Sequence, residues 1–230
     1  MRKVGIVGGI GPASTLDYYS GIIDGCRASV NDESYPEIFI DSVDMIEMLS
    51  YLERGDWNSL TEMLVKAINR LKAAGAQFAA IASNTPHIVF DMIEKRSPLP
   101  LISIVDETIA YAQAKGVNKA VVIGTRFTMG SGLYAKAFSK LGIAAVTPSE
   151  NEQEEIHGII FPKLENGIID LKDKDRLLTL ANRLITEHNA DALVLGCTEL
   201  PLMIRENDID TLIINTTQIH IDAIIRAVIK

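Results

Sequence analysis

The stretch AAGAQFAAIASNTPH, residues 73–87, carries the pattern that decides the fold. Its apolar run has the composition of a strand that is buried on both faces of a parallel sheet. The run ends abruptly at three small polar residues, Ser83, Asn84 and Thr85. Residues 187–201, EHNADALVLGCTELP, repeat this layout with Cys197 in the place of Ser83. A buried strand that ends in hydrogen-bonding groups is therefore predicted twice.

Two further pairs of segments repeat in the same order. RKVGIVGGIGPAST (residues 2–15) matches NKAVVIGTRFTMGSG (residues 118–132), and PLISIVDETIAYA (residues 100–112) matches TLIINTTQIHIDAI (residues 211–224). The offsets drift slowly: 116 from Gly8 to Gly124, 114 from Ser83 to Cys197, and 111 from Ile102 to Ile213. Ordered repeats of this kind indicate an internal duplication.

Strand-like and helix-like segments alternate along the chain, which is typical of an α/β fold with parallel sheets. A helix is predicted over residues 15–30 with Ser14 as its cap, and an amphipathic helix over residues 57–74. The predicted fold is two similar α/β halves related by a pseudo-twofold axis, residues 1–114 and 115–216. A C-terminal helix over about residues 217–230 is expected to return to the first half.

Ligands in open α/β sheets bind at the carboxyl ends of the strands. Ser83 and Cys197 are predicted to occupy equivalent strand ends in the two halves. We therefore expect the active site in a cleft between the halves, with these two residues approaching one ligand from opposite sides.

The composition excludes several classes of partner. The chain has 230 residues, 47% of them hydrophobic, and a formal net charge of −8. This acidic balance argues against nucleic acid and anionic membranes, both of which favour a basic surface. No apolar stretch approaches the roughly 18 residues of a membrane span. Only two cysteines occur, and the chain carries no export signal, so a cytoplasmic protein with reduced thiols is predicted.

Three motifs leave structural and functional readings open. The glycine-rich GGIGPAS (residues 8–14) is either a tight strand-to-helix turn or a carboxylate-binding turn. A third possibility is an incomplete dinucleotide-binding fingerprint, in which Asp41 or Asp44 would bind the ribose. SNTPH (residues 83–87) is either an ordinary helix cap or an anion site at a helix N-terminus, and three polar residues exceed what capping needs. His87 and His220 either orient catalytic groups or satisfy buried backbone.

GCTELP (residues 196–201) places a thiol at a predicted helix N-terminus. Such a position lowers the pKa of a thiol, so Cys197 is expected to be a competent base. Cys26 has no polar cluster beside it and is predicted to be a core residue. No histidine pairs with another histidine or a cysteine in a metal-ligand pattern.

Together, GGIGPAST, SNTPH, GTRFTMGSG and GCTELP resemble the aspartate/glutamate racemase family, and GCTE resembles its aspartate-racemase branch. The resemblance spans nearly the whole chain. It implies racemisation of an acidic amino acid without pyridoxal phosphate, metal or other cofactor, through two bases on opposite faces of the substrate Cα. It also implies a homodimer.

The resemblance assigns roles to individual residues. Cys197 and Ser83 would be the catalytic pair, and Glu199 would assist the thiol. Asn84, Thr85 and Thr198 would hold the α-carboxylate, and Ile10 and Thr125 are further substrate contacts. Arg126 and Lys163 are the candidates for the distal carboxylate, because SVDMIEM (residues 42–48) offers only Met48 where relatives have an arginine.

Ser83 departs from the family pattern, which usually has a cysteine there. A hydroxyl is a poor base without help. Ser83 is therefore either the mark of an enzyme that prefers one enantiomer, expected to be L, or a replacement that impairs turnover. A decarboxylase or isomerase of small dicarboxylates and a non-catalytic dicarboxylate or amino-acid binder are the alternative functions. Aspartate and glutamate remain equal as substrates.

Overall fold

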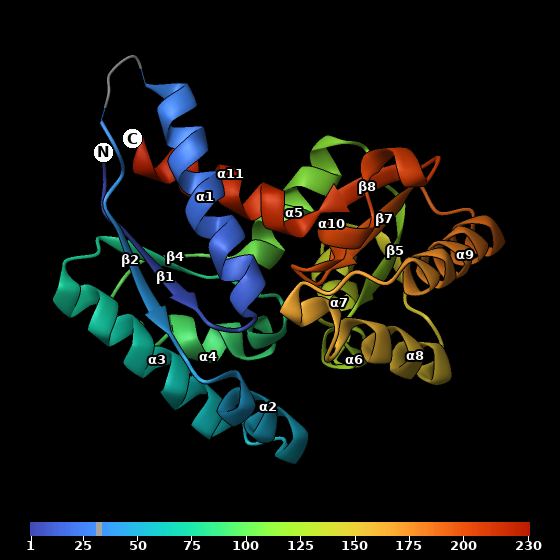
Figure 1. Cartoon of the computed structure of the whole chain (residues 1–230), viewed down its shortest axis with the longest axis horizontal. Helices are drawn as coiled ribbons and strands as arrows, with labels where there is room; N and C mark the ends of the chain where they lie inside the picture. Colours follow the sequence, from blue (N-terminus) through green and yellow to red (C-terminus); the bar gives the residue numbers. More distant parts are fainter. Residues whose placement is uncertain (31–33) are drawn as a thin grey trace. The chain divides into compact units, whose positions relative to one another are not determined.

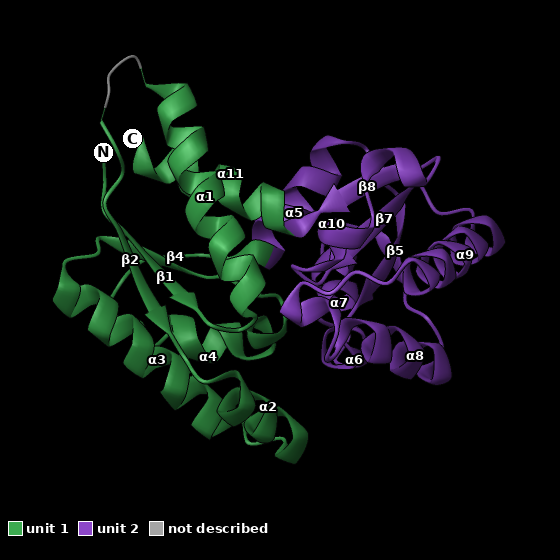
Figure 2. Ribbon diagram, in the orientation of Figure 1, with its two compact units in different colours: residues 1–104, 217–230 green, residues 105–216 purple. Residues whose placement is uncertain are grey.

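The computed structural model describes residues 1–30 and 34–230, which form two compact units. Unit 1 comprises residues 1–104 and 217–230, and unit 2 comprises residues 105–216 (Figure 2). The C-terminal helix thus belongs with the N-terminal sheet. The predicted division at residue 114 and the unit boundary at residue 104 differ by one helix, Ile104–Ala114.

Unit 1 is built on a four-stranded parallel sheet with strand order β2-β1-β3-β4 (Figure 1). Its elements are β1 (Val4–Gly8), α1 (Pro12–Ser29), β2 (Ile38–Ser42), α2 (Met45–Arg54), α3 (Trp57–Ala74), β3 (Phe78–Ile81), the 3-10 helix η1 (Thr85–Val89), α4 (Phe90–Glu94), β4 (Leu101–Ile102) and α11 (Thr216–Val228).

Unit 2 is built on a second four-stranded parallel sheet with strand order β6-β5-β7-β8. Its elements are α5 (Ile104–Ala114), β5 (Lys119–Gly124), α6 (Arg126–Gly130), α7 (Leu133–Ser139), β6 (Ala144–Val146), α8 (Glu150–Ile160), η2 (Leu164–Asn166), α9 (Leu171–His188), β7 (Ala192–Gly196), α10 (Leu200–Met203), η3 (Glu206–Asp208) and β8 (Leu212–Asn215).

The two sheets have the same topology, which confirms the predicted α/β fold of two similar parallel sheets. The register refines one correspondence. Ala80 pairs with Ile102, and Val194, the counterpart of Ala80, pairs with Ile214. The counterpart of Ile102 is therefore Ile214, one residue later than the sequence comparison placed it.

Successive residues of β1 face opposite sides of the sheet, and helices cover both sides, so all residues of the strand are buried. Val4 and Ile6 join a core with α1 and α11, whereas the added Cβ of Gly5 would lie against Leu71 of α3. Figure 1 shows α1 and α11 on one side of this sheet and α3 on the other. In unit 2, β5 and β7 share a core with α8 and α9. Helices on the sheet faces account for the apolar strands of the sequence.

Helix α3 begins and ends where the sequence predicts, at Trp57 and Ala74, and the Asp56 side chain accepts a hydrogen bond from the Ser59 amide. Helix α1, by contrast, begins at Pro12, three residues before the predicted start. Proline suits the first helical position because it has no amide hydrogen to satisfy there. Ser14 therefore lies inside the helix, and its hydroxyl donates to the Gly11 carbonyl over 3.0 Å. The prediction that Ser14 caps α1 was wrong.

Candidate functional site

The carboxyl ends of β5 and β7 lie side by side because the two strands pair through Gly124 and Gly196. A Cβ added to Gly124 would lie 2.7 Å from the Gly196 carbonyl oxygen, so only glycine permits this approach. Thr125 and Cys197 each follow one of these glycines. The register thus brings two sequence-predicted site residues to one edge of the second sheet.

The thiol of Cys197 is held by the carboxylate two residues later. Cys197 Sγ lies 3.0 Å from Glu199 Oε2 and donates to it, and the Thr198 hydroxyl donates to the same oxygen over 2.9 Å. Cys197 is 4% exposed and Glu199 is 1% exposed. Cys197, Thr198 and Glu199 therefore form one buried hydrogen-bonded group, as expected of residues that act together.

A third acidic residue, Glu165, joins this group from η2. Its carboxylate, the Glu199 carboxylate and Cys197 Sγ offer atoms that all lie within 4.8 Å of one another. Sequence reasoning missed Glu165, although it considered Lys163 in the same segment. No local pattern marks Glu165, because its partners are more than thirty residues away along the chain.

Burial raises the pKa of the Cys197 thiol well above its ordinary value, and the charges of Glu199 and Glu165 add to this. The sequence predicted a lowered pKa, and this was wrong. The helix that follows, α10, has four residues and a correspondingly small dipole, whereas loss of water and two nearby carboxylates both disfavour the thiolate. The resting group is therefore a protonated thiol beside an acceptor carboxylate.

Burial also raises the pKa of Glu165, with a further contribution from the Glu199 charge. A buried carboxyl group next to another carboxylate favours the neutral acid. The site can thus hold protons on Cys197 and on Glu165 at neutral pH, and the Cys197 thiol donates to Glu199.

In unit 1, Ser83, Asn84 and Thr85 follow β3 and are buried. Asn84 is the residue before η1, and its side chain makes no capping hydrogen bond. Asn84 therefore does not act as an ordinary side-chain cap of the helix that follows SNTPH. Three buried polar side chains at a strand end are a feature typical of a binding site.

His87 holds the backbone of Ser83 in place. The Ile104 amide donates to His87 Nε2 over 3.3 Å, so Nδ1 carries the proton and donates to the Ser83 carbonyl over 2.9 Å. His220 donates from Nε2 to the Ile102 carbonyl over 3.0 Å and accepts the Tyr18 hydroxyl at Nδ1 over 2.7 Å. Both histidines satisfy buried backbone groups, and His87 also positions Ser83.

Burial lowers the pKa of His87 to about 3 and that of His220 to about 4. Both rings are neutral at physiological pH, consistent with their hydrogen bonds.

Comparison with known proteins decides the family. The sequence model of the Asp/Glu/hydantoin racemase family matches residues 7–224. The chain belongs to this family. Membership makes it an isomerase, of the amino-acid racemase kind.

Several relatives resemble the chain over most of its length. The broad-specificity amino-acid racemase of Bacillus subtilis is 28% identical over 86% of this chain and 85% of its own. The crystal structure of an aspartate racemase homologue from Pyrococcus horikoshii is 34% identical over the whole of both chains, with a TM-score of 0.85. The Picrophilus torridus aspartate racemase shares the fold at 22% identity, with a TM-score of 0.75 over 99% of this chain and 94% of its own.

The structure places the two cationic candidates of this racemase differently. Arg126 begins α6 directly after β5, and its Nη1 lies 3.3 Å from the Glu154 carboxylate. The Lys163 side chain is half-exposed, and its Nζ lies 2.8 Å from Asp173 and 3.4 Å from Asp170. Thr125 caps α6 by accepting the Thr128 amide over 3.2 Å.

The glycine-rich segment of the racemase is a tight turn. Gly9 has a φ of +83°, and its amide donates to the Thr15 hydroxyl over 2.9 Å, so this amide is used within the turn. Ile10 is buried beside it. Asp41 forms an ion pair with Arg70, and Asp44 caps α2 by accepting two backbone amides. Neither aspartate fits the role of a ribose-binding acid.

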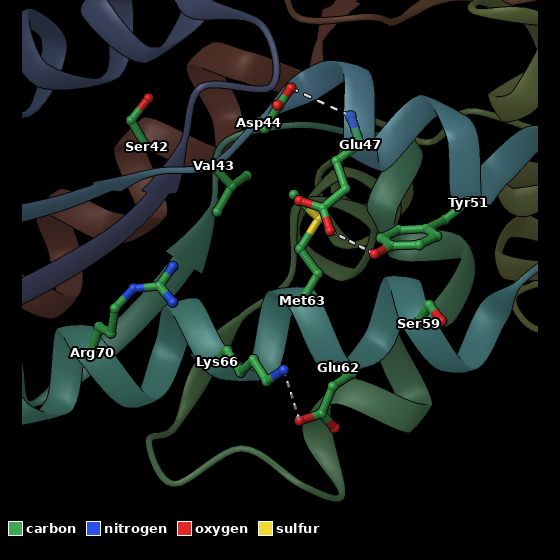
Figure 3. Close-up of a pocket in the computed structure, with 10 residues that line it drawn as sticks. All are labelled: Ser42, Val43, Asp44, Glu47, Tyr51, Ser59, Glu62, Met63, Lys66 and Arg70. Carbon is green, nitrogen blue, oxygen red and sulfur yellow. Dashed lines mark hydrogen bonds and ion pairs between the residues drawn. The ribbon is translucent and has the colours of Figure 1, made fainter.

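A pocket of about 420 Å³ lies in unit 1 between α2, α3 and the end of β2 (Figure 3). Glu47, Glu62 and Lys66 are among the residues that line it; Lys66 pairs with Glu62, and Tyr51 donates to Glu47 over 2.5 Å. Asp44 lines this pocket, but none of the residues predicted to act on or bind the amino-acid substrate does. No helix in residues 1–30 and 34–230 is long and apolar enough to cross a bilayer.

Proposed function

We propose that the chain racemises an acidic amino acid by removing and returning the proton at Cα, with Cys197 as the thiol acid and base. The observation that carries the proposal is the buried Cys197–Glu199 pair, with its Sγ–Oε2 distance of 3.0 Å. Membership of the racemase family supports the reaction class.

The proton steps balance within this pair. As the Cys197 thiol passes its proton to the Glu199 carboxylate, the thiolate takes the α-proton of the substrate. The electron pair left on Cα delocalises into the substrate carboxylate, which Asn84, Thr85 and Thr198 stabilise by hydrogen bonding. A proton returned to the opposite face completes inversion. Cys197 then carries the former α-proton as its thiol hydrogen, and Glu199 releases its proton to solvent as the group that protonated Cα takes one up.

Ser83 delivers the proton to the second face in this proposal, because it follows β3 as Cys197 follows β7 in an equivalent sheet. A hydroxyl is a much weaker acid and base than a thiol. The enantiomer that presents its α-hydrogen to Cys197 therefore reacts faster, and we expect this to be the L form.

Arg126 is the proposed partner of the distal carboxylate, and Ile10 and Thr125 complete the substrate contacts. Arg126 lies two residues beyond the strand pair that positions Cys197. Lys163 is the weaker candidate, since two aspartates already surround its ammonium group. Arginine suits a carboxylate because it donates two parallel hydrogen bonds.

One observation favours a second function. Cys26 is fully buried in the core of unit 1, so Cys197 is the single thiol at a strand end. Decarboxylation or isomerisation of a small dicarboxylate needs fewer proton-transfer groups and suits one thiol. Non-catalytic binding of a dicarboxylate or amino acid is the remaining alternative.

The test is proton NMR of L- and D-aspartate and L- and D-glutamate in D2O with the purified chain. Loss of the α-proton signal, abolished by Cys197→Ala and unchanged by Cys26→Ala, would support the proposal. Chiral analysis of the same samples shows whether exchange leads to racemisation. Ser83→Cys should speed exchange of the slower enantiomer.

If neither the unmodified chain nor Ser83→Cys exchanges the α-proton, the acidic-racemase proposal is wrong. A wider panel of amino acids, and carbon dioxide release from malonates, would then separate a broader racemase from a decarboxylase.

A further inference from the structure

Glu165, Cys197 and Glu199 form a compact buried cluster within unit 2. Their exposed fractions are 8%, 4% and 1%, and their potential ligand atoms all lie within 4.8 Å of one another. Two come from the loop after β7, and the third comes from η2. The cluster contains two oxygen donors and one sulfur donor in a space that water barely enters.

One carboxylate oxygen of Glu165 lacks a hydrogen-bond partner in this cluster. Among the residues that the structure describes, its Oε2 atom is buried and has no hydrogen-bond partner. An unsatisfied buried polar group is destabilising, and more so when it is charged. Glu199 Oε2 already accepts from both Cys197 and Thr198. Hydrogen bonds inside the cluster thus leave the Oε2 atom of Glu165 without a partner, whereas a cation would bind it directly.

We propose that Glu165, Cys197 and Glu199 bind a thiophilic divalent cation of the Zn²⁺ class. Zinc takes thiolate sulfur at about 2.3 Å and carboxylate oxygen at about 2.0–2.2 Å, commonly with three protein ligands and one open position. Donors of one tetrahedral ion lie roughly 3.5 Å apart on these bond lengths, so small rotations of the carboxyl groups suffice. The sulfur ligand favours zinc over magnesium and calcium, which prefer oxygen alone.

Binding releases the Cys197 thiol proton to solvent and places the sulfur lone pair on the metal. That lone pair is the one with which Cys197 would take a substrate proton, so the bound ion inhibits the enzyme and a chelator restores it. The inhibition rests on the proposed function. Metal binding does not, because it requires only the three side chains.

Cobalt titration of the chelator-treated full chain tests the site without reference to activity. We expect about one equivalent of Co²⁺ to give a thiolate-to-cobalt charge-transfer band in the near ultraviolet, with visible bands of tetrahedral intensity that Zn²⁺ abolishes. Cys197→Ala should remove the charge-transfer band. Glu165→Gln should weaken binding by at least about tenfold, because even losing an outer-shell partner costs that much.

Two matched variants test whether the loss of any thiol or any carboxylate group would weaken cobalt binding. Cys26→Ala removes the other buried cysteine, and Glu206→Gln removes an exposed carboxylate of the same unit. Both should bind cobalt with unchanged affinity. Near-ultraviolet circular dichroism establishes that each variant is folded before titration.

A folded chain without a charge-transfer band would overturn the proposal. So would a band that keeps its affinity in Glu165→Gln, because Cys197 would then bind metal without the cluster. Cobalt binding by a chain that exchanges no α-proton would support the metal site while refuting the racemase proposal. Exchange that saturating Zn²⁺ leaves unchanged would overturn the inhibition.

Discussion

At the scale of single residues, the pairing of Cys197 with Glu199 sets the chemistry of the site. Burial and the charges of two carboxylates raise the pKa of the thiol, and in the proposed mechanism the thiolate forms as Glu199 accepts its proton. A base made in this way is strong because its pKa is high, and it is kept from solvent by its surroundings. The raised pKa is therefore compatible with proton abstraction at carbon.

Glu199→Gln separates the two effects of this carboxylate. Loss of the acceptor should slow α-proton exchange by about 10²-fold or more, the usual contribution of a general base. Loss of its charge should at the same time lower the pKa of Cys197 and speed alkylation by iodoacetamide at fixed pH, because Glu199 raises that pKa. Exchange in D2O and mass-spectrometric alkylation rates measure the two.

Glu206→Gln is the control and should change neither rate. Slower exchange combined with slower alkylation would indicate a misplaced loop rather than a missing base.

At the scale of elements, the strand ends are positioned by close backbone contact and by helix caps. The Gly124–Gly196 pair lets β5 and β7 approach where Thr125 and Cys197 begin. Asp44 fixes the start of α2 beyond β2. Each device acts locally, so each can be tested by one substitution.

Gly124→Ala should destabilise the chain by about 1–3 kcal/mol, the usual cost of an added group in a packed site. Its Cβ would lie 2.7 Å from a backbone oxygen that cannot move away easily. Gly158→Ala in α8 is the matched control, since its Cβ would meet nothing within 4 Å. It should stabilise by about 0.5–1 kcal/mol, because alanine favours helix. Urea unfolding measures both, and equal effects would contradict the prediction.

Asp44→Ala should cost about 1 kcal/mol, because the amides of Ile46 and Glu47 lose their acceptor. Asp44→Asn keeps an acceptor oxygen and should recover most of this loss. Urea denaturation followed by circular dichroism gives the free energies of unfolding. If the alanine and asparagine variants are equally stable, Asp44 does not act as a cap.

At the scale of the whole molecule, buried groups of the two units contribute to the pH dependence of stability with opposite sign. In unit 1, the pKa values of His87 and His220 lie near 3 and 4, below the ordinary 6.5, so the unfolded chain binds protons first. Their contribution to stability is present above pH 6.5 and is lost as pH falls. In unit 2, the raised pKa of Glu165 gives a contribution that is present at low pH and is lost as pH rises.

His87→Gln isolates one of these contributions. Each depressed histidine changes the free energy of unfolding by about 1.4 kcal/mol per pH unit below pH 6.5. The variant should therefore show a pH slope that is smaller by about this amount between pH 6 and 5. His188→Gln, at an exposed helix end, should leave the slope unchanged. Urea midpoints at each pH provide the measurement, and identical slopes in the wild type and His87→Gln would refute the prediction.

The sequence by itself determined the two-sheet α/β fold, the length of α3 and the strand ends that carry Ser83 and Cys197. These follow from hydrophobic period, which is local, and from a repeated order of segments, which is visible along the chain without knowledge of the contacts. The same motifs pointed to the racemase family. The start of α1 was misplaced because a proline at the first helical position outweighed a serine cap.

Only the tertiary structure decided the environment of the thiol. Glu165 meets Cys197 because η2 folds against the loop after β7, and no spacing in the chain encodes that contact. The direction of the Cys197 pKa shift followed from burial and from those carboxylates rather than from its place before a helix. Lys163 lies close to Glu165 in sequence, yet its ammonium group lies among aspartates. Electrostatic properties of this kind depend on which distant segments exclude water together.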